Sequence, residues 1–316
     1  MRYRYLFGPV PSRRLGVSLG VDLIPSKTCT LNCIYCECGK TTNLTVERKE
    51  YVPVEEVMAE LNDYLRTAPT LDYITFSGSG EPTLNSQIGV VIDFLKKEFN
   101  RYPLCLLTNG TLFSDPAVRM AVNKLDLIIP SLDAASEKVF KRINRPHRSI
   151  DCQTLIDGLV KLRREYRGII ILEVFIVPGL NDTKEEVSRL KKAIAKIKPD
   201  RVQLGTLDRP GTEDWVEAAE PLKMKEIAHA LGNVELIGDF QPRQKIASFN
   251  QSYSRQILQI IRRRPCTLED LHRILNLHPA EIQKYVNHLL EMERIEVEPK
   301  RRGVFLKIKH NPWGYA

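Results

Sequence analysis

The sequence predicts an α/β fold in which repeated βα units build a parallel sheet, followed by a smaller helical domain. From about residue 18 to residue 240, short β-branched segments alternate with longer amphipathic segments, which is typical of a parallel sheet covered by helices. Beyond residue 245, three helical segments and two short strands follow instead. The 316 residues are 43% hydrophobic, enough for one large core and a small second one. We therefore expect two domains, residues 1–245 and 246–316.

Six strands and six helices are expected in the first domain. The strand candidates are rich in Val, Ile and Leu and cover residues 18–25, 71–78, 103–110, 125–133, 168–179 and 200–208. The helix candidates lie after them and cover residues 53–67, 85–99, 115–123, 150–166, 183–197 and 222–231. Two helices have start signals, because Asp115 stands before Pro116, and Asn181 and Asp182 precede a first turn rich in acids.

The second domain has the element order of a winged helix-turn-helix. Three helices and a hairpin with a basic tip are expected at residues 252–264, 267–276, 278–294 and 295–308. Thr267 is the expected N-cap of the second helix, with Asp270 in the capping-box position. This class is very large, so it predicts an architecture and no ligand.

Positive charge is concentrated near the end of the chain. The formal net charge is +8, and residues 251–316 carry 12 Lys and Arg against 7 Asp and Glu, a net of +5. This segment is therefore the expected place for a polyanion to bind. The chain has no apolar run long enough to span a membrane, and its first residues lack the features of a signal peptide. We expect a cytoplasmic protein with no membrane partner.

The seven cysteines are spaced very unevenly. An odd number in a reducing compartment argues against a disulfide framework. Four of them lie close together near the N-terminus and are better interpreted as ligands or reactive thiols: Cys29, Cys33, Cys36 and Cys38. The other three are expected to be buried small side chains: Cys105, Cys152 and Cys266.

Polar or glycine-rich residues follow four of the predicted strands, in the segments FSGSGEPT, LLTNGT, PSLDAAS and IVPGLND. The loop with the four cysteines, residues 26–40, follows the first strand. Because the carboxyl ends of parallel strands lie at one edge of the sheet, loops there converge on one cleft. The sequence therefore predicts a site at this edge. The segment PSRR, residues 11–14, either belongs to it or is an ordinary loop.

Cys29, Cys33 and Cys36 are spaced C-x3-C-x2-C, with Tyr35 directly before the third. Together with the strand-end motifs, this spacing resembles the radical S-adenosylmethionine (SAM) superfamily over about residues 18–210. The resemblance implies a partial (β/α)6 TIM-type barrel and an enzyme whose three thiolates bind a [4Fe-4S] cluster. SAM then binds the open iron, and an electron donor such as flavodoxin or ferredoxin drives formation of a 5'-deoxyadenosyl radical. That radical takes a hydrogen atom from the substrate.

The resemblance also implies SAM contacts at the ends of the second and third strands. The segment GSGEPTL, residues 78–84, is similar to the family's Gly-Gly-Glu motif, with Ser79 in the place of the first glycine. By this match Gly80 allows close approach of the backbone, and Glu81 accepts a hydrogen bond from the SAM amino group. Asn109, in TNG, is placed near the methionyl or ribose end of the cofactor.

The fourth and fifth strands carry the remaining contacts that the resemblance implies. Ser131 and Asp133, in PSLD, match positions that meet the SAM carboxylate and ribose. The backbone of residues 174–179, including Val177, would pass by the adenine, as would Tyr35.

The spacing of the cysteines, taken alone, is compatible with a structural zinc site in which Cys38 is a fourth thiolate. Such sites, however, usually draw their ligands from two separated pairs. The strand-end segments are also good turn sequences. Cys38 itself is either a spare thiol near the cluster, a ligand of a second metal, a transient sulfur carrier or a loop cysteine without a role.

Residues 7–36 resemble a branch of uncharacterised iron-sulfur oxidoreductases related to the tRNA wyosine-base synthases. Those synthases carry a second cluster on cysteines ahead of the radical motif, and no cysteine precedes Cys29 here, so their activity is not carried over. Three substrate classes remain: an RNA or another nucleic acid, which is slightly favoured; a peptide or protein, including a glycyl-radical partner; and a small molecule. Nucleic-acid phosphates would contact residues 262–264, Lys284 and residues 300–302. A regulator that uses the cluster as a redox sensor is the non-enzymatic alternative.

Overall fold

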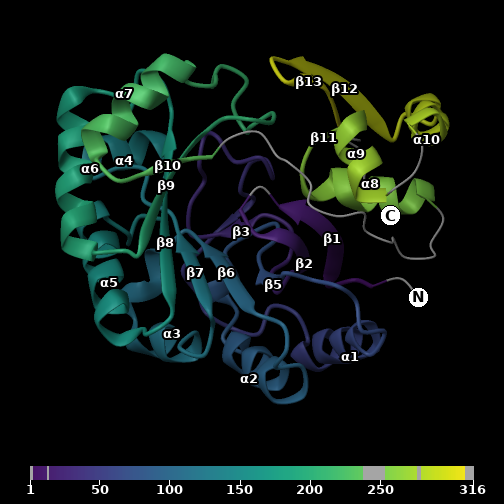
Figure 1. Cartoon of the computed structure of the whole chain (residues 1–316), viewed down its shortest axis with the longest axis horizontal. Helices are drawn as coiled ribbons and strands as arrows, with labels where there is room; N and C mark the ends of the chain where they lie inside the picture. The colour runs from purple at the N-terminus through teal and green to yellow at the C-terminus, as the bar shows by residue number, and fades with distance from the viewer. Residues whose placement is uncertain (1–2, 13, 238–252, 276–278, 310–316) are drawn as a thin grey trace.

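The computed structural model describes residues 3–12, 14–237, 253–275 and 279–309. Its main body is an eight-stranded sheet in the order β1-β2-β5-β6-β7-β8-β9-β10, in which every neighbouring pair after β1-β2 is parallel. The sheet curves into a partial barrel with helices on its outer side (Figure 1). The predicted α/β class with a partial TIM-type barrel is therefore confirmed.

The elements of the main body follow one another in chain order. The strands of the large sheet are β1 (Leu6–Ser12), β2 (Gly16–Val21), β5 (Tyr73–Phe76), β6 (Leu104–Thr108), β7 (Leu127–Pro130), β8 (Ile169–Ile176), β9 (Arg201–Thr206) and β10 (Glu235–Leu236). The α-helices are α1 (Val54–Leu65), α2 (Ile88–Glu98), α3 (Pro116–Ala121), α4 (Glu137–Ile143), α5 (Cys152–Glu165), α6 (Lys184–Ile197) and α7 (Pro221–Leu231). The short elements in the loops are the strand pair β3 (Thr28–Cys29) and β4 (Asn43–Leu44) and the 3-10 helices η1 (Pro82–Leu84) and η2 (Thr111–Ser114). None of the described helices is both long and apolar enough to cross a membrane.

All six strands and six helices predicted for the first domain are present, with ends that differ by a few residues. The prediction missed β1, which pairs antiparallel with β2 at the edge of the sheet. Its sequence contains Pro9 and Pro11, and proline is acceptable in a strand mainly at such an edge, where fewer backbone donors are required. The short helix α4 was also missed, because seven residues give little periodicity to detect.

The start of helix α6 corrects one detail of the prediction. Its N-cap is Thr183, whose hydroxyl accepts a hydrogen bond from the Glu186 backbone N–H at 3.3 Å. Asn181, expected as a start signal, is instead fully buried, and its side-chain nitrogen donates to the carbonyl oxygens of Asp133 (2.8 Å) and Phe175 (2.7 Å). Asn181 therefore ties the ends of strands β7 and β8 together.

The main core lies between the sheet and its helices. Alternate strand residues such as Leu19, Ile74 and Leu172 are fully buried and pack toward the helices. Each such side chain stabilises the fold by about 1.5–3 kcal/mol through burial alone. The residues between them point into the barrel, because successive strand side chains alternate faces. Toward the amino ends of the strands this inner face is apolar, with Cys105 and Leu127 buried there.

Residues 253–309 form a second body, here called the C-terminal unit. It contains α8 (Tyr253–Arg263), β11 (Cys266–Thr267), α9 (Leu268–Leu275), α10 (Pro279–Glu291), β12 (Ile295–Lys300) and β13 (Gly303–Ile308). It has its own hydrophobic core and packs α8 and α9 against strand β1 (Figure 1). The predicted capping box is present, since Thr267 and Asp270 exchange hydrogen bonds of 2.9 and 3.1 Å. The winged-helix class stays a prediction, and the predicted domain boundary after residue 245 lies outside the described residues.

Candidate active site

The cysteine loop is held over the carboxyl ends of the strands by backbone bonds and by one buried side chain. The backbone N–H of Ile34 donates to the Ile143 carbonyl at the end of α4 (2.9 Å), and that of Asn32 donates to the Asn144 carbonyl (2.9 Å). The Ile34 side chain is fully buried against Ile143 and Val177. These contacts fix the loop between helix α4 and strand β8, at the edge where the sequence predicts a site.

Three of the four loop cysteines each face a nitrogen donor, two of which come from outside the loop and one from within it. Asn109 Nδ2 lies 3.5 Å from Cys29 Sγ, Asn144 Nδ2 lies 3.3 Å from Cys33 Sγ, and Lys27 Nζ lies 3.4 Å from Cys36 Sγ. Such donors favour the thiolate over the thiol, and a thiolate is the form that binds metals. Asn144 and Lys27 were not predicted to belong to the site.

The fourth cysteine has different surroundings. Cys38 Sγ lies 3.6 Å from the carbonyl oxygen of Gly78, an acceptor that favours the protonated thiol. A hydrogen bond from Cys38, followed by the nearby Lys27 ammonium, holds the pKa of Cys36 below its usual value, and the same bond raises the pKa of Cys38. Burial raises the pKa of Cys29 to about 12. Cys38 thus differs from the other three loop cysteines, because it faces an oxygen acceptor and not a nitrogen donor.

The loop after strand β5 packs against the cysteine strand β3 so closely that one position must be glycine. A Cβ atom on Gly80 would lie 2.0 Å from the backbone oxygen of Thr28. The preceding Ser79 lies beside Asp22, whose Oδ2 is 3.3 Å from the Ser79 backbone nitrogen and 3.4 Å from its hydroxyl. The predicted close approach at Gly80 is therefore to the chain's own backbone.

Glu81 is buried at the centre of a hydrogen-bond network. Its Oε1 accepts from the hydroxyls of Thr83 and Thr108, both at 2.6 Å, and from the Thr83 backbone N–H at 3.1 Å. Its Oε2 accepts from the Asn109 backbone N–H at 2.8 Å. Burial raises the pKa of Glu81, and these hydrogen bonds oppose the rise. Because Asn109 in turn contacts Cys29, Glu81 orders one side of the cysteine loop.

Asp133 is the centre of a second network on the opposite side of the loop. Its Oδ2 accepts from the Tyr35 hydroxyl (2.5 Å) and Asn144 Nδ2 (2.7 Å), and its Oδ1 accepts from the Phe175 backbone N–H (3.0 Å). The Tyr35 ring stacks on Phe175, with centroids 3.9 Å apart and planes 13° apart. Asp133 therefore positions both Tyr35 and the amide that faces Cys33.

Ser131 and Val177 complete the set of predicted contacts. Ser131 follows strand β7 and is half-buried, and its backbone N–H donates to the Thr108 carbonyl at 3.1 Å. Val177 is buried after strand β8, and its N–H donates to Asn181 Oδ1 at 2.8 Å. All of the predicted site residues thus lie at one edge of the sheet, around the cysteine loop.

The network around Asp133 predicts a distinct pH dependence of stability. Burial raises the pKa of Asp133 from 3.8 to about 6 against the opposing hydrogen bonds. The folded protein then holds this proton more tightly than the unfolded chain. As the pH rises from about 4 to about 6, the free energy of unfolding therefore falls by about 3 kcal/mol through this group. We expect the Asp133→Asn variant to lack this fall, measured by urea unfolding of the metal-free protein across that range. Parallel pH profiles for the two proteins would contradict the assignment.

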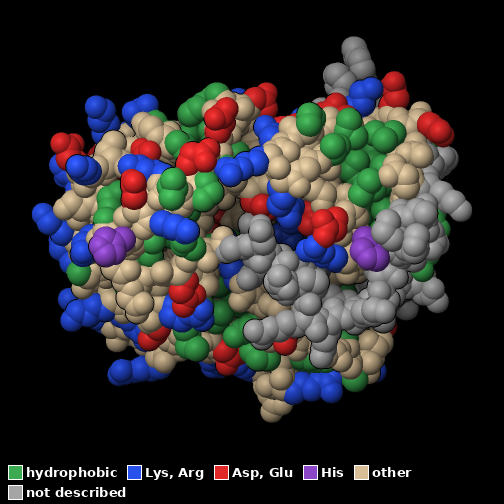
Figure 2. Space-filling model, turned by 45° about the horizontal axis from the view of Figure 1, so that its top comes forward, with side chains coloured by type: hydrophobic (Ala, Val, Ile, Leu, Met, Phe, Trp, Pro, Cys, Tyr) green, Lys and Arg blue, Asp and Glu red, His purple; other side chains and the backbone are tan. Residues whose placement is uncertain are grey.

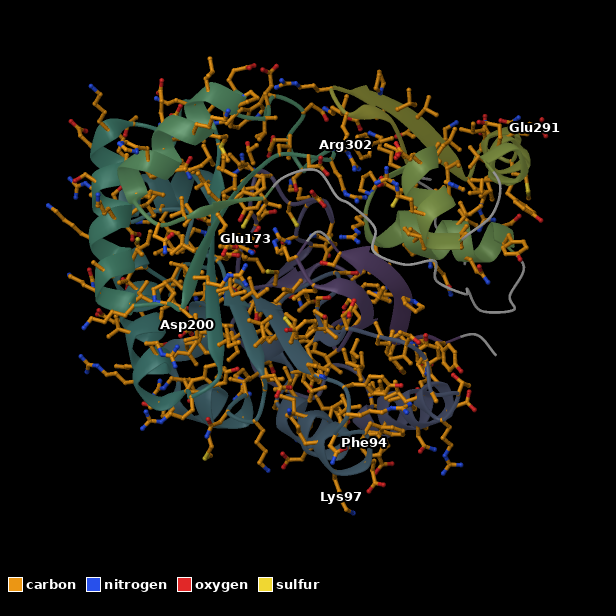
Figure 3. All side chains as sticks on the ribbon, viewed as in Figure 1. Phe94, Lys97, Glu173, Asp200, Glu291 and Arg302 are labelled. Atoms are coloured by element: carbon orange, nitrogen blue, oxygen red, sulfur yellow. The ribbon has the colours of Figure 1, made fainter. Side chains whose placement is uncertain are left out.

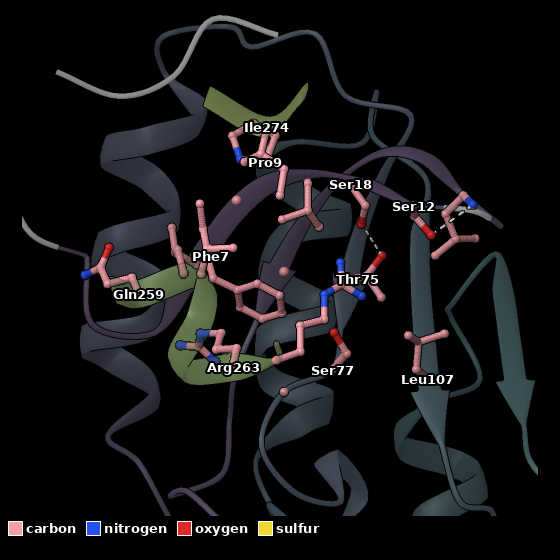
Figure 4. A pocket seen from close by; sticks show the side chains of 18 of the residues that line it. Phe7, Pro9, Ser12, Ser18, Thr75, Ser77, Leu107, Gln259, Arg263 and Ile274 are labelled. Carbon is pink, nitrogen blue, oxygen red and sulfur yellow. Dashed lines mark hydrogen bonds between the residues drawn. The ribbon is translucent and has the colours of Figure 1, made fainter. Parts of the chain in front are cut away.

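Two cavities open at the same edge of the sheet. The large cavity, about 1070 Å³, is lined by Tyr35, Cys36 and Phe175 on the barrel side and by residues 300–302 of the C-terminal unit. Figure 3 shows Glu173 inside the curve of the sheet and Arg302 on the facing hairpin. The small cavity, about 230 Å³, is lined by Phe7, Ser18, Thr75, Cys38 and Arg263, among others (Figure 4).

An ion pair inside the barrel was missed by sequence reasoning. Arg14 pairs with Glu173, and both side chains line the large cavity. Glu173 is an isolated acid within the apolar strand β8, and a lone charge in such a strand is a signal that could have indicated it. Arg14 belongs to the segment PSRR, for which the sequence allows two roles, and it lies at the site.

A partial βα barrel that carries three donor-facing cysteines over its strand ends has the architecture of enzymes that perform radical chemistry with SAM. The family model described as the Radical SAM superfamily matches residues 23–194, and the chain belongs to this superfamily. It is therefore an enzyme, and its cofactors are those of the superfamily, a [4Fe-4S] cluster and SAM. Superfamily membership also establishes cleavage of SAM as the source of its radical chemistry.

Similar proteins extend over nearly the whole chain. A GTPase Obg of Brachyspira hyodysenteriae is 35% identical over 94% of this chain, but the chain spans only 44% of that relative's length. A UPF0026 protein of Methanocaldococcus jannaschii is 31% identical over 85% of each protein. Among solved structures, a radical SAM methyltransferase from Sphaerobacter thermophilus is 18% identical, with a TM-score of 0.53 over 70% of this chain and 65% of that one. That likeness supports the fold of the barrel.

The residues present fit a [4Fe-4S] cluster with SAM. The buried Oδ1 of Asn144, beside Cys33, accepts no hydrogen bond from the residues that the structure describes. The large cavity reaches Cys36 and exceeds the size of about 300–1,000 Å³ that is usual for small-ligand pockets. In the described ranges, no three His, Cys, Asp or Glu side chains converge on one point as a single metal ion requires. A cluster makes no such demand, because it distributes its thiolates over separate irons.

Proposed function

We propose that Cys29, Cys33 and Cys36 bind the [4Fe-4S] cluster and that the surrounding strand ends bind SAM. The observation that carries this proposal is that each of the three sulfur atoms has its own nitrogen donor, and that one of the three cysteines, Cys36, lines a large cavity. When bound, the cluster and SAM supply a one-electron reduction and a radical that abstracts hydrogen. An electron donor such as flavodoxin or ferredoxin provides the electron.

The chain's own residues orient this chemistry. Asn109, Asn144 and Lys27 stabilise the three thiolates, and hydrogen bonds to sulfur are one of the means by which a protein sets a cluster's potential. Glu81 and Asp133 act largely by fixing Asn109 and Asn144, since their oxygens already accept hydrogen bonds from the chain.

The direct SAM contacts that we propose are made by side chains and backbone at the strand ends around the cysteine loop, of which Tyr35 lines the large cavity. They are Tyr35, Ser79, Ser131 and the backbone of Gly80 and Val177, with Glu81, Asn109 and Asp133 in support. The apolar cluster around Cys105 and Leu127 fills the inner face toward the amino ends of the strands, and apolar packing there excludes water from one side of a reactive intermediate.

The substrate that the site favours is an RNA nucleoside. The hairpin tip brings Lys300, Arg301 and Arg302 to the large cavity, which also reaches Cys36. Figure 2 shows blue and red side chains close together where the C-terminal unit meets the barrel. Cations at the entrance to a reactive centre attract a phosphate backbone. The side chain of Lys284, also predicted to contact phosphate, lies outside those that the structure describes.

SAM cleavage tests the cofactor part of this proposal. Protein reconstituted anaerobically with iron and sulfide should convert SAM to methionine and 5'-deoxyadenosine when dithionite is added, as measured by liquid chromatography and mass spectrometry. Omitting dithionite is the control. If a protein with full cluster content gives no 5'-deoxyadenosine, the proposed function is wrong.

A further inference from the structure

The C-terminal unit contributes cations to the walls of both cavities. Helix α8 and the residue after it supply Arg263 and Arg264, and the hairpin between β12 and β13 supplies Lys300, Arg301 and Arg302. The two cavities adjoin, because Ser12, Glu37 and Arg264 line both of them. A ligand in either cavity therefore meets positive charge close to the cysteine loop.

Four of these five cations pair with carboxylates. Arg263 pairs with Asp22, Lys300 with Glu298 (2.9 Å), Arg301 with Glu220 (3.8 Å) and Arg302 with Asp270 (2.8 Å). Arg263 also lies over the Phe7 ring, 4.2 Å from its centroid. These ion pairs offset part of the four charges, and the pair of Arg301 with Glu220 is a weak one between exposed side chains.

Arg264 is the exception. Among the residues described, it makes no ion pair, although it is half-buried between the two cavities. Burial and then the nearby Arg209 guanidinium lower the pKa of Arg264, and Cys266 and Glu37 act in the opposite direction. Arg209 is itself held in place, since its Nη1 donates to the Pro265 carbonyl at 2.6 Å. Arg209 Nε also lies 3.7 Å from Glu37 and 3.8 Å from Asp208, and its Nη1 lies 3.7 Å from Asp270. Among the described residues these three acids pair with Arg209, and none of them pairs with Arg264.

A half-buried guanidinium without a carboxylate partner favours an anion from outside the chain. Arginine presents several parallel N–H donors that match the oxygens of a phosphate group. The cavities that Arg264 joins are lined by Cys36 on one side and Cys38 on the other, so an anion held there lies next to the cysteine loop. A charge that has no partner in this position lowers the stability of the fold. An anion bound to Arg264 supplies that partner.

Building on the proposed function, we propose that Arg264 determines substrate specificity by binding a phosphate group of the substrate, with the attached nucleoside directed toward the cysteine loop. The phosphate belongs either to an RNA chain or to a free nucleotide. In both cases the C-terminal unit completes the active site, and the barrel alone lacks the anion contact.

Binding to the reconstituted full-length enzyme tests this proposal. The variants are Arg264→Gln, the charge-retaining Arg264→Lys, and Arg262→Gln as a matched control, since Arg262 lies two positions away in the last turn of α8, is exposed and lines neither cavity. The probes are mixed tRNA, guanosine 5'-monophosphate and guanosine without phosphate, each titrated at constant ionic strength. We expect Arg264→Gln to weaken binding of the phosphate-bearing probe about tenfold or more, Arg264→Lys to weaken it less, and Arg262→Gln to change it about twofold or less.

The outcomes distinguish the two possible sources of the phosphate. They also distinguish failure of the proposed role of Arg264 from failure of the proposed function. An effect confined to tRNA supports an RNA substrate, and an effect on guanosine 5'-monophosphate supports a free nucleotide. Equal losses for Arg264→Gln and Arg262→Gln would overturn the role of Arg264, because they would reflect net charge alone. Failure of wild-type enzyme to bind any phosphate probe while it still produces 5'-deoxyadenosine would overturn this inference and the proposed RNA substrate, and would leave the proposed cluster and SAM cleavage standing.

Discussion

Alanine in place of Cys33 should remove the visible absorbance of the iron-sulfur cluster and reduce SAM cleavage by about 100-fold or more. The reason is that the protein loses a cluster bound by three thiolates when one of the three is removed. Cys33 is the most informative of the three, since its sulfur accepts from Asn144, which Asp133 holds in turn. Iron content, the visible spectrum and 5'-deoxyadenosine formation should therefore fall together.

Cys38→Ala is the matched control for this experiment. Cys38 lies in the same loop but faces the Gly78 carbonyl, and no side-chain nitrogen of a described residue is placed to donate to it as in the other three. We expect this variant to keep its iron and most of its SAM cleavage. Equal loss of iron from Cys38→Ala and Cys33→Ala would mean that all four thiols hold the metal, and a colourless zinc-containing protein would support the zinc alternative.

The fold was predicted well where the sequence is periodic. Strands such as β8 show long apolar runs, and helices such as α5 show an amphipathic period with an N-cap at Asp151. Strand β1 escaped prediction because its two prolines argue against a strand unless its edge position is already known. Helix α4 escaped because one or two turns carry no clear period.

The site was predicted by motif, but its supporting contacts were not. Cys33 and Asn144 are 111 positions apart in sequence, and only the packing of the loop on helix α4 brings them together. Glu81 and Asp133 were predicted as direct SAM contacts, a role that stays a prediction. A motif gives the position of a carboxylate but not its partners, so the sequence could not indicate that these oxygens accept hydrogen bonds from Thr108, Asn109 and Tyr35.

Gly80→Ala should be among the most damaging single substitutions at this site that change no charged or metal-binding group. The added Cβ would lie 2.0 Å from the Thr28 carbonyl oxygen, and a backbone atom has little freedom to move away. Thr28 belongs to strand β3 with Cys29, so relief of the clash displaces a proposed cluster ligand. We expect a loss of about 3 kcal/mol in the free energy of unfolding, together with a lower iron content after reconstitution.

Gly89→Ala is the control, because it adds the same methyl group inside helix α2. There the nearest backbone atom, the Ala121 oxygen, lies at 3.3 Å, and alanine favours the helix by about 0.5–1 kcal/mol. Urea unfolding and iron analysis of both variants then separate general packing effects from the contact with β3. If Gly80→Ala kept full stability and full iron, the loop after β5 would have to be able to move away from β3. Its close approach could then not be what holds Cys29 in place.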